Sequence, residues 1–217
     1  MEGMVGIVDY KAGNIRSVER ALAALGCQYI IADKPTDLEK ASKLIFPGVG
    51  DAQYAMEQLK LSGFDAFLRE KVAQQVPVLG ICLGSQIIFD FSEEGDTPCL
   101  GLIPGTIRHF SSIKENFPLK VPHMGWNNLQ YRDGVGDSGL FAGIREEHSY
   151  YFVHSYVIQP EDESVILATA DYGITVPAAV KKGSLVAVQF HPEKSGVPGL
   201  QLLRNFVFGG AEGGVSC

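Results

Sequence analysis

Through about its first ninety residues the chain alternates short strand-like runs with segments of helical periodicity, and this alternation constrains the fold most strongly. Strands are predicted over residues 4–8, 27–31, 43–46 and 76–81, and helices over residues 15–25, 37–41 and 64–73. Asn14 is predicted to cap the first helix and Gly26 to end it. Alternation of this kind predicts an α/β fold, in which a parallel sheet carries helices on both faces and binds ligands beyond the carboxyl ends of its strands.

The second half of the chain has shorter strands and more turns. Strands are predicted over residues 150–158 and 165–170, and a hairpin is predicted from strands 178–180 and 185–190. A final helix is predicted over residues 200–208, and the glycine-rich residues after it are expected to fray. We therefore expect one domain, residues 1–217, built on an open, mostly parallel, twisted sheet with helices on both faces and antiparallel strands in its C-terminal half.

Charge and hydropathy argue against two classes of partner. The formal net charge is −7, and no basic run is longer than Lys181-Lys182. Nucleic acid is therefore not expected as a partner, because neutralising phosphates needs clustered Lys and Arg. Apolar stretches such as 76–83 and 150–158 are far shorter than the ~20 residues of a membrane span, and the first ten residues lack the basic flank of a signal peptide. A soluble, cytoplasmic protein with no membrane contact is expected.

The cysteines give one candidate for chemistry. No C-x-x-C pair is present, so a zinc site is not expected, and a chain of 217 residues does not depend on a disulfide framework. A single cysteine is ordinarily a small buried hydrophobic residue. That role is expected for three of the four, whereas the neighbours of Cys82 point elsewhere. The four are Cys27, Cys82, Cys99 and Cys217.

Cys82 lies between two glycines in Gly80-Ile81-Cys82-Leu83-Gly84, where a buried strand gives way to a helix-like run over residues 86–91. This is the arrangement of a nucleophile elbow, with Cys in place of Ser. The sharp turn strains the backbone at the nucleophile, and glycine on either side removes side chains that would collide. Backbone N–H groups at the start of the helix can hold an oxyanion. The alternative is a buried cysteine in a tight turn.

A candidate base follows a strand near the other end of the chain. His191-Pro192-Glu193 comes directly after the strand predicted to end at residue 190. A cysteine nucleophile needs a base to take and return a proton, and the base needs an acceptor that orients it. His191 and Glu193 fit these roles. The histidines that compete for the role of base are His109, His123, His148 and His154.

A glycine-rich loop, Pro47-Gly48-Val49-Gly50, follows the third predicted strand and ends at the same sheet edge. The glycines let the peptide at Val49 turn its N–H toward a ligand, so the loop is a candidate half of an oxyanion hole, with an ordinary strand-to-helix turn as the alternative. The chain carries no glycine-rich nucleotide motif and no H-E-x-x-H, so no nucleotide, metal or other cofactor is expected.

These motifs together resemble those of class I, triad-type glutamine amidotransferases. Four further segments closely resemble the glutaminase subunits of imidazole glycerol phosphate synthase, from histidine biosynthesis, and the resemblance runs from about residue 4 to about residue 208. The four are Val8-Asp9-Tyr10 with Gly13-Asn14-Ile15, Pro122-His123-Met124-Gly125-Trp126-Asn127, Phe152-Val153-His154-Ser155-Tyr156 and His191-Pro192-Glu193-Lys194-Ser195-Gly196.

The resemblance implies a mechanism for hydrolysing glutamine. The Cys82 thiolate would attack the side-chain amide, His191 would give a proton to the departing ammonia, and Glu193 would hold His191 in place. Water would then release glutamate from the thioester. The oxyanion would be held by the N–H groups of Leu83 and of Val49, whose peptide must be turned inward. The implied substrate-binding residues are Gly48, Gly50, Gln86, Glu94, Ser155 and Tyr156.

The resemblance also implies a partner. Ammonia in water is mostly protonated and useless as a nucleophile, so it has to reach its acceptor through a dry channel. In the family a (β/α)₈-barrel cyclase subunit forms a heterodimer with the glutaminase and uses the ammonia to make imidazole glycerol phosphate and an aminoimidazole carboxamide ribotide. The residues implied at this interface are Asn14, Trp126, Tyr151 and Lys194.

Three alternatives stay open at this stage. The chain could be the glutaminase of another class I amidotransferase, serving anthranilate, guanylate or pyridoxal phosphate synthesis. It could be a non-catalytic subunit that docks on a synthase, although the intact Cys82, His191 and Glu193 argue against this. A cysteine peptidase on a similar sheet would need the elbow but not the glycine loop.

Overall fold

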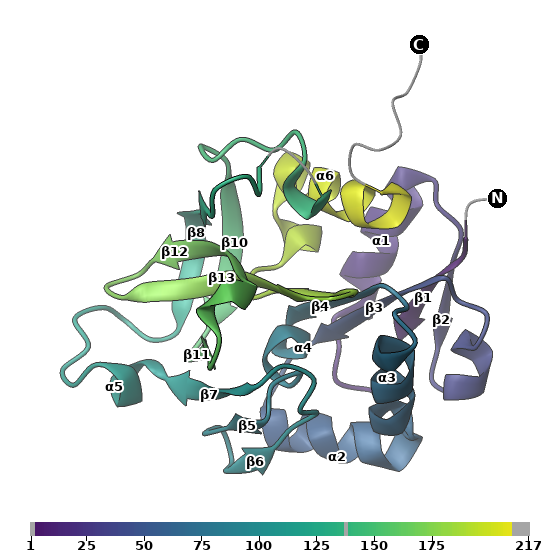
Figure 1. Cartoon of the computed structure of the whole chain (residues 1–217), viewed down its shortest axis with the longest axis horizontal. Helices are drawn as coiled ribbons and strands as arrows, with labels where there is room; N and C mark the ends of the chain where they lie inside the picture. The colour runs from purple at the N-terminus through teal and green to yellow at the C-terminus, as the bar shows by residue number, and fades with distance from the viewer. Residues whose placement is uncertain (1–2, 137–138, 210–217) are drawn as a thin grey trace.

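Residues 3–136 and 139–209 are described by a computed structural model, in which a twisted eight-stranded sheet is central (Figure 1). Five of its strands run parallel, in the order β2 (Tyr29–Ala32), β1 (Val5–Val8), β3 (Lys43–Gly48), β4 (Val78–Cys82) and β14 (Leu185–Val188). Three antiparallel strands continue it: β13 (Thr175–Lys182), β12 (Ile166–Asp171) and β9 (Gln130–Tyr131). The predicted open, mostly parallel sheet with antiparallel C-terminal strands is confirmed.

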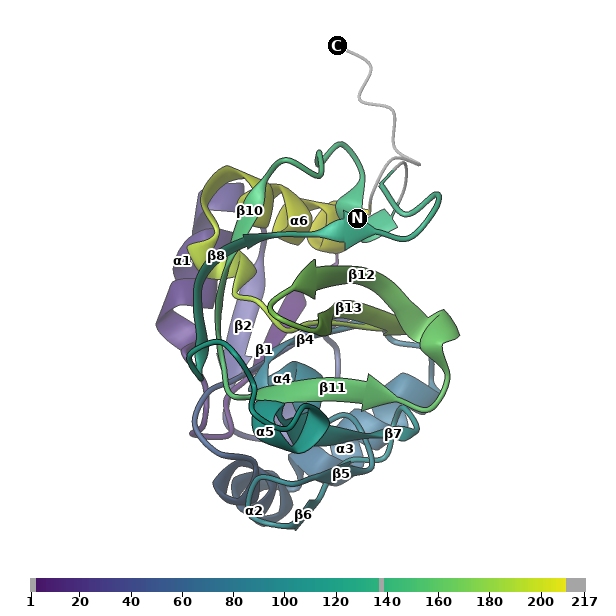
Figure 2. The same ribbon diagram turned by 90° about the vertical axis from the view of Figure 1, so that its left-hand side faces the viewer.

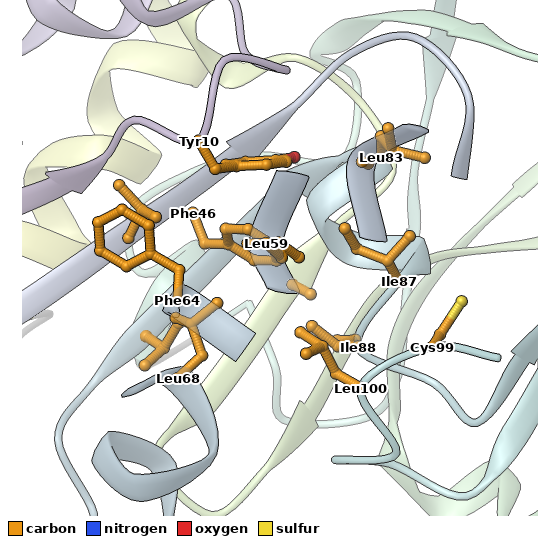
Figure 3. Packing of buried hydrophobic residues seen from close by; sticks show 14 of the residues in the cluster. Tyr10, Phe46, Leu59, Phe64, Leu68, Leu83, Ile87, Ile88, Cys99 and Leu100 are labelled. Carbon is orange, nitrogen blue, oxygen red and sulfur yellow. The ribbon is translucent and has the colours of Figure 1, made fainter. Parts of the chain in front are cut away.

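Helices cover both faces of this sheet, as predicted (Figure 1). On one face lie α1 (Ile15–Leu25) and α6 (Gly196–Phe208), and on the other lie α2 (Ala52–Ser62) and α3 (Phe64–Ala73). Each face has its own apolar core, because the parallel strands are buried on both sides. Figure 3 shows the core beneath α2 and α3, where Phe46 of β3 packs among Leu59, Phe64 and Leu68.

Two smaller sheets border the carboxyl end of β4, where α4 (Leu83–Gln86) begins (Figure 2). One pairs β8 (His123–Asn128) with β10 (Ser149–His154), and the other has the order β11 (Tyr156–Pro160), β7 (Gly105–His109), β5 (Phe91–Ser92) and β6 (Thr97–Pro98). The single strand predicted over residues 150–158 is therefore wrong. The chain changes partners at Ser155, because His154 pairs with His123 whereas Tyr156 pairs with His109.

Several predicted helices differ in extent. The helix predicted over 86–91 is α4, which is one turn long and ends at Gln86, since Phe91 already belongs to β5. The helix predicted over 37–41 is a 3₁₀ turn, η1 (Pro35–Leu38). Asn14 precedes α1 as predicted, but its side chain caps no backbone N–H and instead accepts a hydrogen bond from the Ser17 hydroxyl. The other short helical turns are α5 (Phe110–Ile113), η2 (Gly139–Phe141), η3 (Glu163–Val165) and η4 (Pro192–Lys194).

Helix α2 was not predicted, although both of its ends carry recognisable signals. Asp51 caps it by accepting a hydrogen bond from the Tyr54 N–H at 2.8 Å, and Gly63 ends it in the left-handed conformation.

The expected ordinary role of the other cysteines is confirmed for Cys99, which is buried and lies beside Ile88 and Leu100 in Figure 3. Cys27 is only half-buried, and its thiol donates to the carbonyl of Leu22. Cys217, like the other residues expected to fray, lies outside the described residues. No helix within the described ranges is long and apolar enough to cross a membrane.

Candidate active site

Cys82 ends β4 in the strained conformation of a nucleophile elbow. Its φ of 54° and ψ of −112° are rarely adopted by residues other than glycine and cost about 1–3 kcal/mol. Two contacts hold this turn. The Ser85 hydroxyl donates to the Cys82 carbonyl at 2.6 Å, and Gly84 lies so close to β3 that an added Cβ would come 2.1 Å from the Phe46 carbonyl oxygen. The predicted elbow is therefore present, with glycine where a side chain would not fit.

His191 follows β14 and is fixed from three sides. Its Nδ1 bonds to the Glu193 carboxylate at 2.7 Å, and the two side chains are only 2% and 1% exposed. The backbone N–H of His191 donates to the Tyr151 carbonyl at 2.9 Å. Ser195, whose role the sequence did not predict, donates its hydroxyl to the His191 carbonyl and accepts the Tyr151 N–H. The carboxylate holds the proton on Nδ1 and leaves Nε2 for Cys82.

The His191 ring favours a positive charge. Burial by itself would lower its pKa, but the interactions with Cys82 and Glu193 outweigh burial and raise the pKa to about 9. Nε2 lies buried without a hydrogen-bond partner among the described residues. A His191 ring that keeps its proton can act as the general acid toward a leaving group.

A cavity of about 340 Å³ opens over Cys82, in the size range of small-molecule sites. Its lining brings together residues from both halves of the chain that the sequence had singled out separately. The predicted site residues in the lining are Val49, Gly50, Cys82, Leu83, Gln86, Glu94, Ser155, Tyr156, His191 and Lys194. Gly48 does not line the cavity and lies in β3, paired with Cys82. Glu193 is also outside this lining, and its carboxylate bonds to His191 Nδ1.

Two of the predicted substrate residues are already bonded within the protein. The Gln86 amide nitrogen donates to the Tyr156 carbonyl at 3.2 Å and to Gln189 Oε1 at 2.8 Å, which fixes the direction of the amide. One Glu94 oxygen accepts the Ala52 N–H at the start of α2, at 2.9 Å. Burial raises the pKa of this carboxyl above its usual range, and the hydrogen bond from Ala52 only partly offsets this.

The peptide N–H of Val49 points away from the site. It donates to the carbonyl of Ala12 at 2.8 Å, across the gap between the loops that follow β1 and β3. In this sheet order the gap is the topological switch point, where α/β proteins commonly bind ligands. Val49 is therefore at the predicted place, but its predicted use as an oxyanion donor requires the bond to Ala12 to break.

Sequence reasoning weighed His123 and His154 only as rival bases and missed what they do together. Their rings are hydrogen-bonded at 3.0 Å and almost fully buried beside the cavity. Burial lowers the pKa of His154 to about 3 and that of His123 to about 4, so both rings are neutral near pH 7. A histidine that must stay neutral is a poor rival to His191 as the base.

This pair makes stability depend on pH in a definite direction. The unfolded chain binds two protons as pH falls through about 6.5, whereas the folded pair does so only near pH 4 and pH 3. From pH 6.5 to 4.5 we therefore expect each histidine to lower the free energy of unfolding by up to about 1.4 kcal/mol per pH unit. Urea unfolding at several pH values measures this slope. His154→Asn should reduce it and His148→Asn should not, and equal slopes in both variants would contradict the assignment.

Comparison with known proteins decides the family. The model of the family described as glutamine amidotransferase class-I matches residues 6–209. The chain belongs to the class I glutamine amidotransferases. Within this family it is 48% identical over 206 residues to the imidazole glycerol phosphate synthase subunit HisH of Geobacillus kaustophilus, covering 94% of this chain and 96% of that one. The HisH subunit of Maridesulfovibrio salexigens is also 48% identical, with 94% and 95% covered.

Solved structures agree with this amidotransferase fold. A crystal structure described as a glutamine amidotransferase has a TM-score of 0.72 at 23% identity, with 95% of this chain and 98% of that chain covered. The structure of PurLQS from Thermotoga maritima has a TM-score of 0.71 at 17% identity, with 96% and 99% covered. At such low identity these likenesses establish the fold alone, whereas the family rests on the matching family model and on the HisH relatives.

Proposed function

We propose that the chain hydrolyses glutamine to glutamate and ammonia through a thioester on Cys82 and passes the ammonia to a (β/α)₈-barrel cyclase subunit. The observation that carries the proposal is the placement of the Cys82 elbow and the His191–Glu193 pair at one cavity, in a chain similar to HisH subunits. We also propose a cytoplasmic location, the compartment in which a catalytic thiol stays reduced.

The proposed chemistry needs only groups that line this cavity. The Cys82 sulfur attacks the amide carbon of glutamine, the carbon–nitrogen bond breaks, and His191 gives its proton to the leaving nitrogen. His191 then takes a proton from water, whose oxygen attacks the thioester. Glutamate leaves with that oxygen, and the thiolate is restored. Two N–H groups, those of Leu83 and Val49, are proposed to hold the oxyanion in both steps.

The proposed interface adjoins the cavity at Lys194, which is part of the cavity lining. Trp126 and Met124 are both 60% exposed and project from the same side of β8. The Trp126 ring meets that of Tyr151 edge to face at 6.0 Å, and Lys194 Nζ lies 5.9 Å from the centre of the Tyr151 ring. Exposed aromatic and methionine side chains are typical of interfaces. Asn14, proposed for the same interface, begins the helix next to the Ala12 loop.

The engaged N–H of Val49 leads us to expect weak glutamine hydrolysis by the isolated chain. A partner that binds better to the form with this N–H turned inward would shift the population toward that form. Mixing the chain with a purified cyclase subunit of imidazole glycerol phosphate synthase and its phosphoribulosyl ligand, and following glutamate release, tests this. We expect stimulation on the order of tenfold or more.

Two controls distinguish stimulation by the cyclase from glutamine hydrolysis by the chain itself. The cyclase alone should release no glutamate, and a barrel protein of another pathway should not stimulate the chain. Full activity of the isolated chain would mean that the Val49 peptide turns without help. No glutamate release in any mixture would refute the glutaminase proposal itself.

A further inference from the structure

A series of side-chain hydrogen bonds beside the cavity connects the three sheets of the described residues. It begins at the Asp171 carbonyl of β12, which accepts from the Asn127 amide nitrogen at 2.8 Å. The same nitrogen lies 3.3 Å from His123 Nε2. His123 Nδ1 lies 3.0 Å from His154 Nε2, and His154 Nδ1 lies 2.7 Å from the Tyr156 carbonyl oxygen in β11.

The groups at the two ends of this series determine which atom donates and which atom accepts in each hydrogen bond. A carbonyl oxygen only accepts, so His154 Nδ1 must donate to Tyr156. Because His154 is neutral, its Nε2 is an acceptor and His123 Nδ1 must be the donor. His123 is neutral as well, so its Nε2 accepts from the second N–H of Asn127. The Asn127 oxygen accepts the N–H of Asn128 at 2.9 Å, which fixes the direction of the amide.

The series of hydrogen bonds ends on the carbonyl of Tyr156. We call the cavity-lining backbone of residues 154–156 the substrate wall. His154, Ser155 and Tyr156 all line the cavity, at the point where the backbone passes from one small sheet to the other. The Tyr156 carbonyl accepts from both His154 and Gln86, so it is held by two buried donors. Around Ser155, where neither register of strand pairing extends, these bonds hold the backbone together with the Phe110 N–H, which donates to the Ser155 carbonyl at 3.3 Å.

The histidine pair is packed as a rigid support. The His123 ring stacks between Phe152 at 4.6 Å and Tyr172 at 3.9 Å, measured between ring centroids. The His154 ring contacts Phe110 at 5.4 Å. His123 is 2% exposed and His154 is 6% exposed. Aromatic contacts of this kind restrict both rings, so the bond to Tyr156 is directed before any substrate arrives.

We propose that His154 and His123 are positioning residues for glutamine hydrolysis, whose directed N–H bonds hold the Tyr156 carbonyl and thereby the Ser155–Tyr156 backbone against which the amino-acid part of glutamine binds. The inference rests on the proposed function, because it supports a substrate site assigned there. The chain of donors ends on a carbonyl rather than on Cys82 or His191, so it orients the substrate wall and carries no proton to the reaction.

The test compares matched variants in the complex with the cyclase. His154→Phe keeps the ring contacts and removes the donor, whereas His154→Asn places an amide N–H near the position of Nδ1. We expect His154→Phe to raise the KM for glutamine by about tenfold with a smaller change in kcat, and His154→Asn to restore KM to within about threefold of the original. His148→Asn, which lies outside the chain of donors, should change neither constant.

Alkylation of Cys82 by iodoacetamide distinguishes damage to the substrate wall from damage to the nucleophile. This reagent makes no use of the amino-acid site, so its rate should be the same in the original complex and in both His154 variants. An unchanged KM in His154→Phe, or equal damage in the two His154 variants, would overturn the proposal. If His154→Phe fails to fold by circular dichroism, His123→Phe and His123→Asn replace the pair, with the same expected order.

A spectroscopic measurement reads the donor chain without activity. The ¹⁵N chemical shifts of the imidazole nitrogens near pH 7 should place the proton of both His123 and His154 on Nδ1. His123→Phe leaves the Tyr156 carbonyl in place as the acceptor, so His154 should keep its proton on Nδ1 in that variant as well. A proton on Nε2 of His123 or His154 in the unsubstituted protein would overturn the proposal. Failure of the original complex to release glutamate would instead refute the proposed function.

Discussion

Replacing Cys82 with alanine is expected to abolish glutamine hydrolysis while leaving the ammonia-driven reaction of the cyclase intact. Without the sulfur no thioester forms, and the loss of a nucleophile from a catalytic triad costs about 10⁴-fold or more in rate. Alanine adds no bulk at this position, and its backbone meets the same strain at a φ of 54°. The complex should therefore assemble and accept ammonia from solution.

Two assays on the same complex measure this effect. One follows glutamate release from glutamine, and the other follows product formation from ammonium salt at high pH. Cys99→Ala is the matched control, because that cysteine is buried away from the cavity and its removal should leave glutamate release unchanged. Loss of both reactions in Cys82→Ala would mean that Cys82 supports the structure rather than the chemistry.

Gly84→Ala is expected to have a large effect although it adds only a single methyl group. The new Cβ would lie 2.1 Å from the Phe46 carbonyl oxygen, so the elbow or β3 must move. Such a shift should lower the free energy of unfolding by roughly 3 kcal/mol. It should also displace the sulfur, and a misplacement of about 1 Å costs on the order of 100-fold in rate.

Gly13→Ala provides the comparison for this substitution. Its Cβ would meet no atom closer than 3.4 Å, so its free energy of unfolding should change by less than about 1 kcal/mol. Urea unfolding of both variants and glutamate release by the Gly84→Ala complex are the measurements. Equal stability of the two variants would show that the elbow tolerates a side chain at residue 84.

The parallel half of the fold was predictable because its strands are buried on both faces and therefore read as continuous apolar runs. Strands β7 and β8 were missed, since polar, glycine and histidine residues interrupt them and their pairing comes from tertiary contacts. The break at Ser155 was equally hidden. Residues 150–158 have uniform strand character, and only the two different partners divide them.

The same contrast holds at the site. Cys82 and the His191–Glu193 pair were predictable because each lies in a short motif whose spacing has a mechanical reason. The orientation of the Val49 peptide was not predictable, because glycine neighbours permit both directions and a contact with Ala12 selects one. The histidine pair escaped prediction because His123 and His154 lie 31 residues apart on separate strands, and only the folded chain brings them together.

The hydrogen bond between Val49 and Ala12 limits how strongly the isolated chain can disfavour the inward-turned Val49 peptide. A backbone hydrogen bond contributes a net free energy of about 0.5–1.5 kcal/mol. By itself it therefore disfavours the inward-turned peptide by a factor of about 2 to 13. Breaking this bond on cyclase binding can account for stimulation within that range, and any larger stimulation requires further changes that the cyclase causes. The size of the measured stimulation would thus show whether this one bond accounts for the control of ammonia release or whether the proposed interface contributes more.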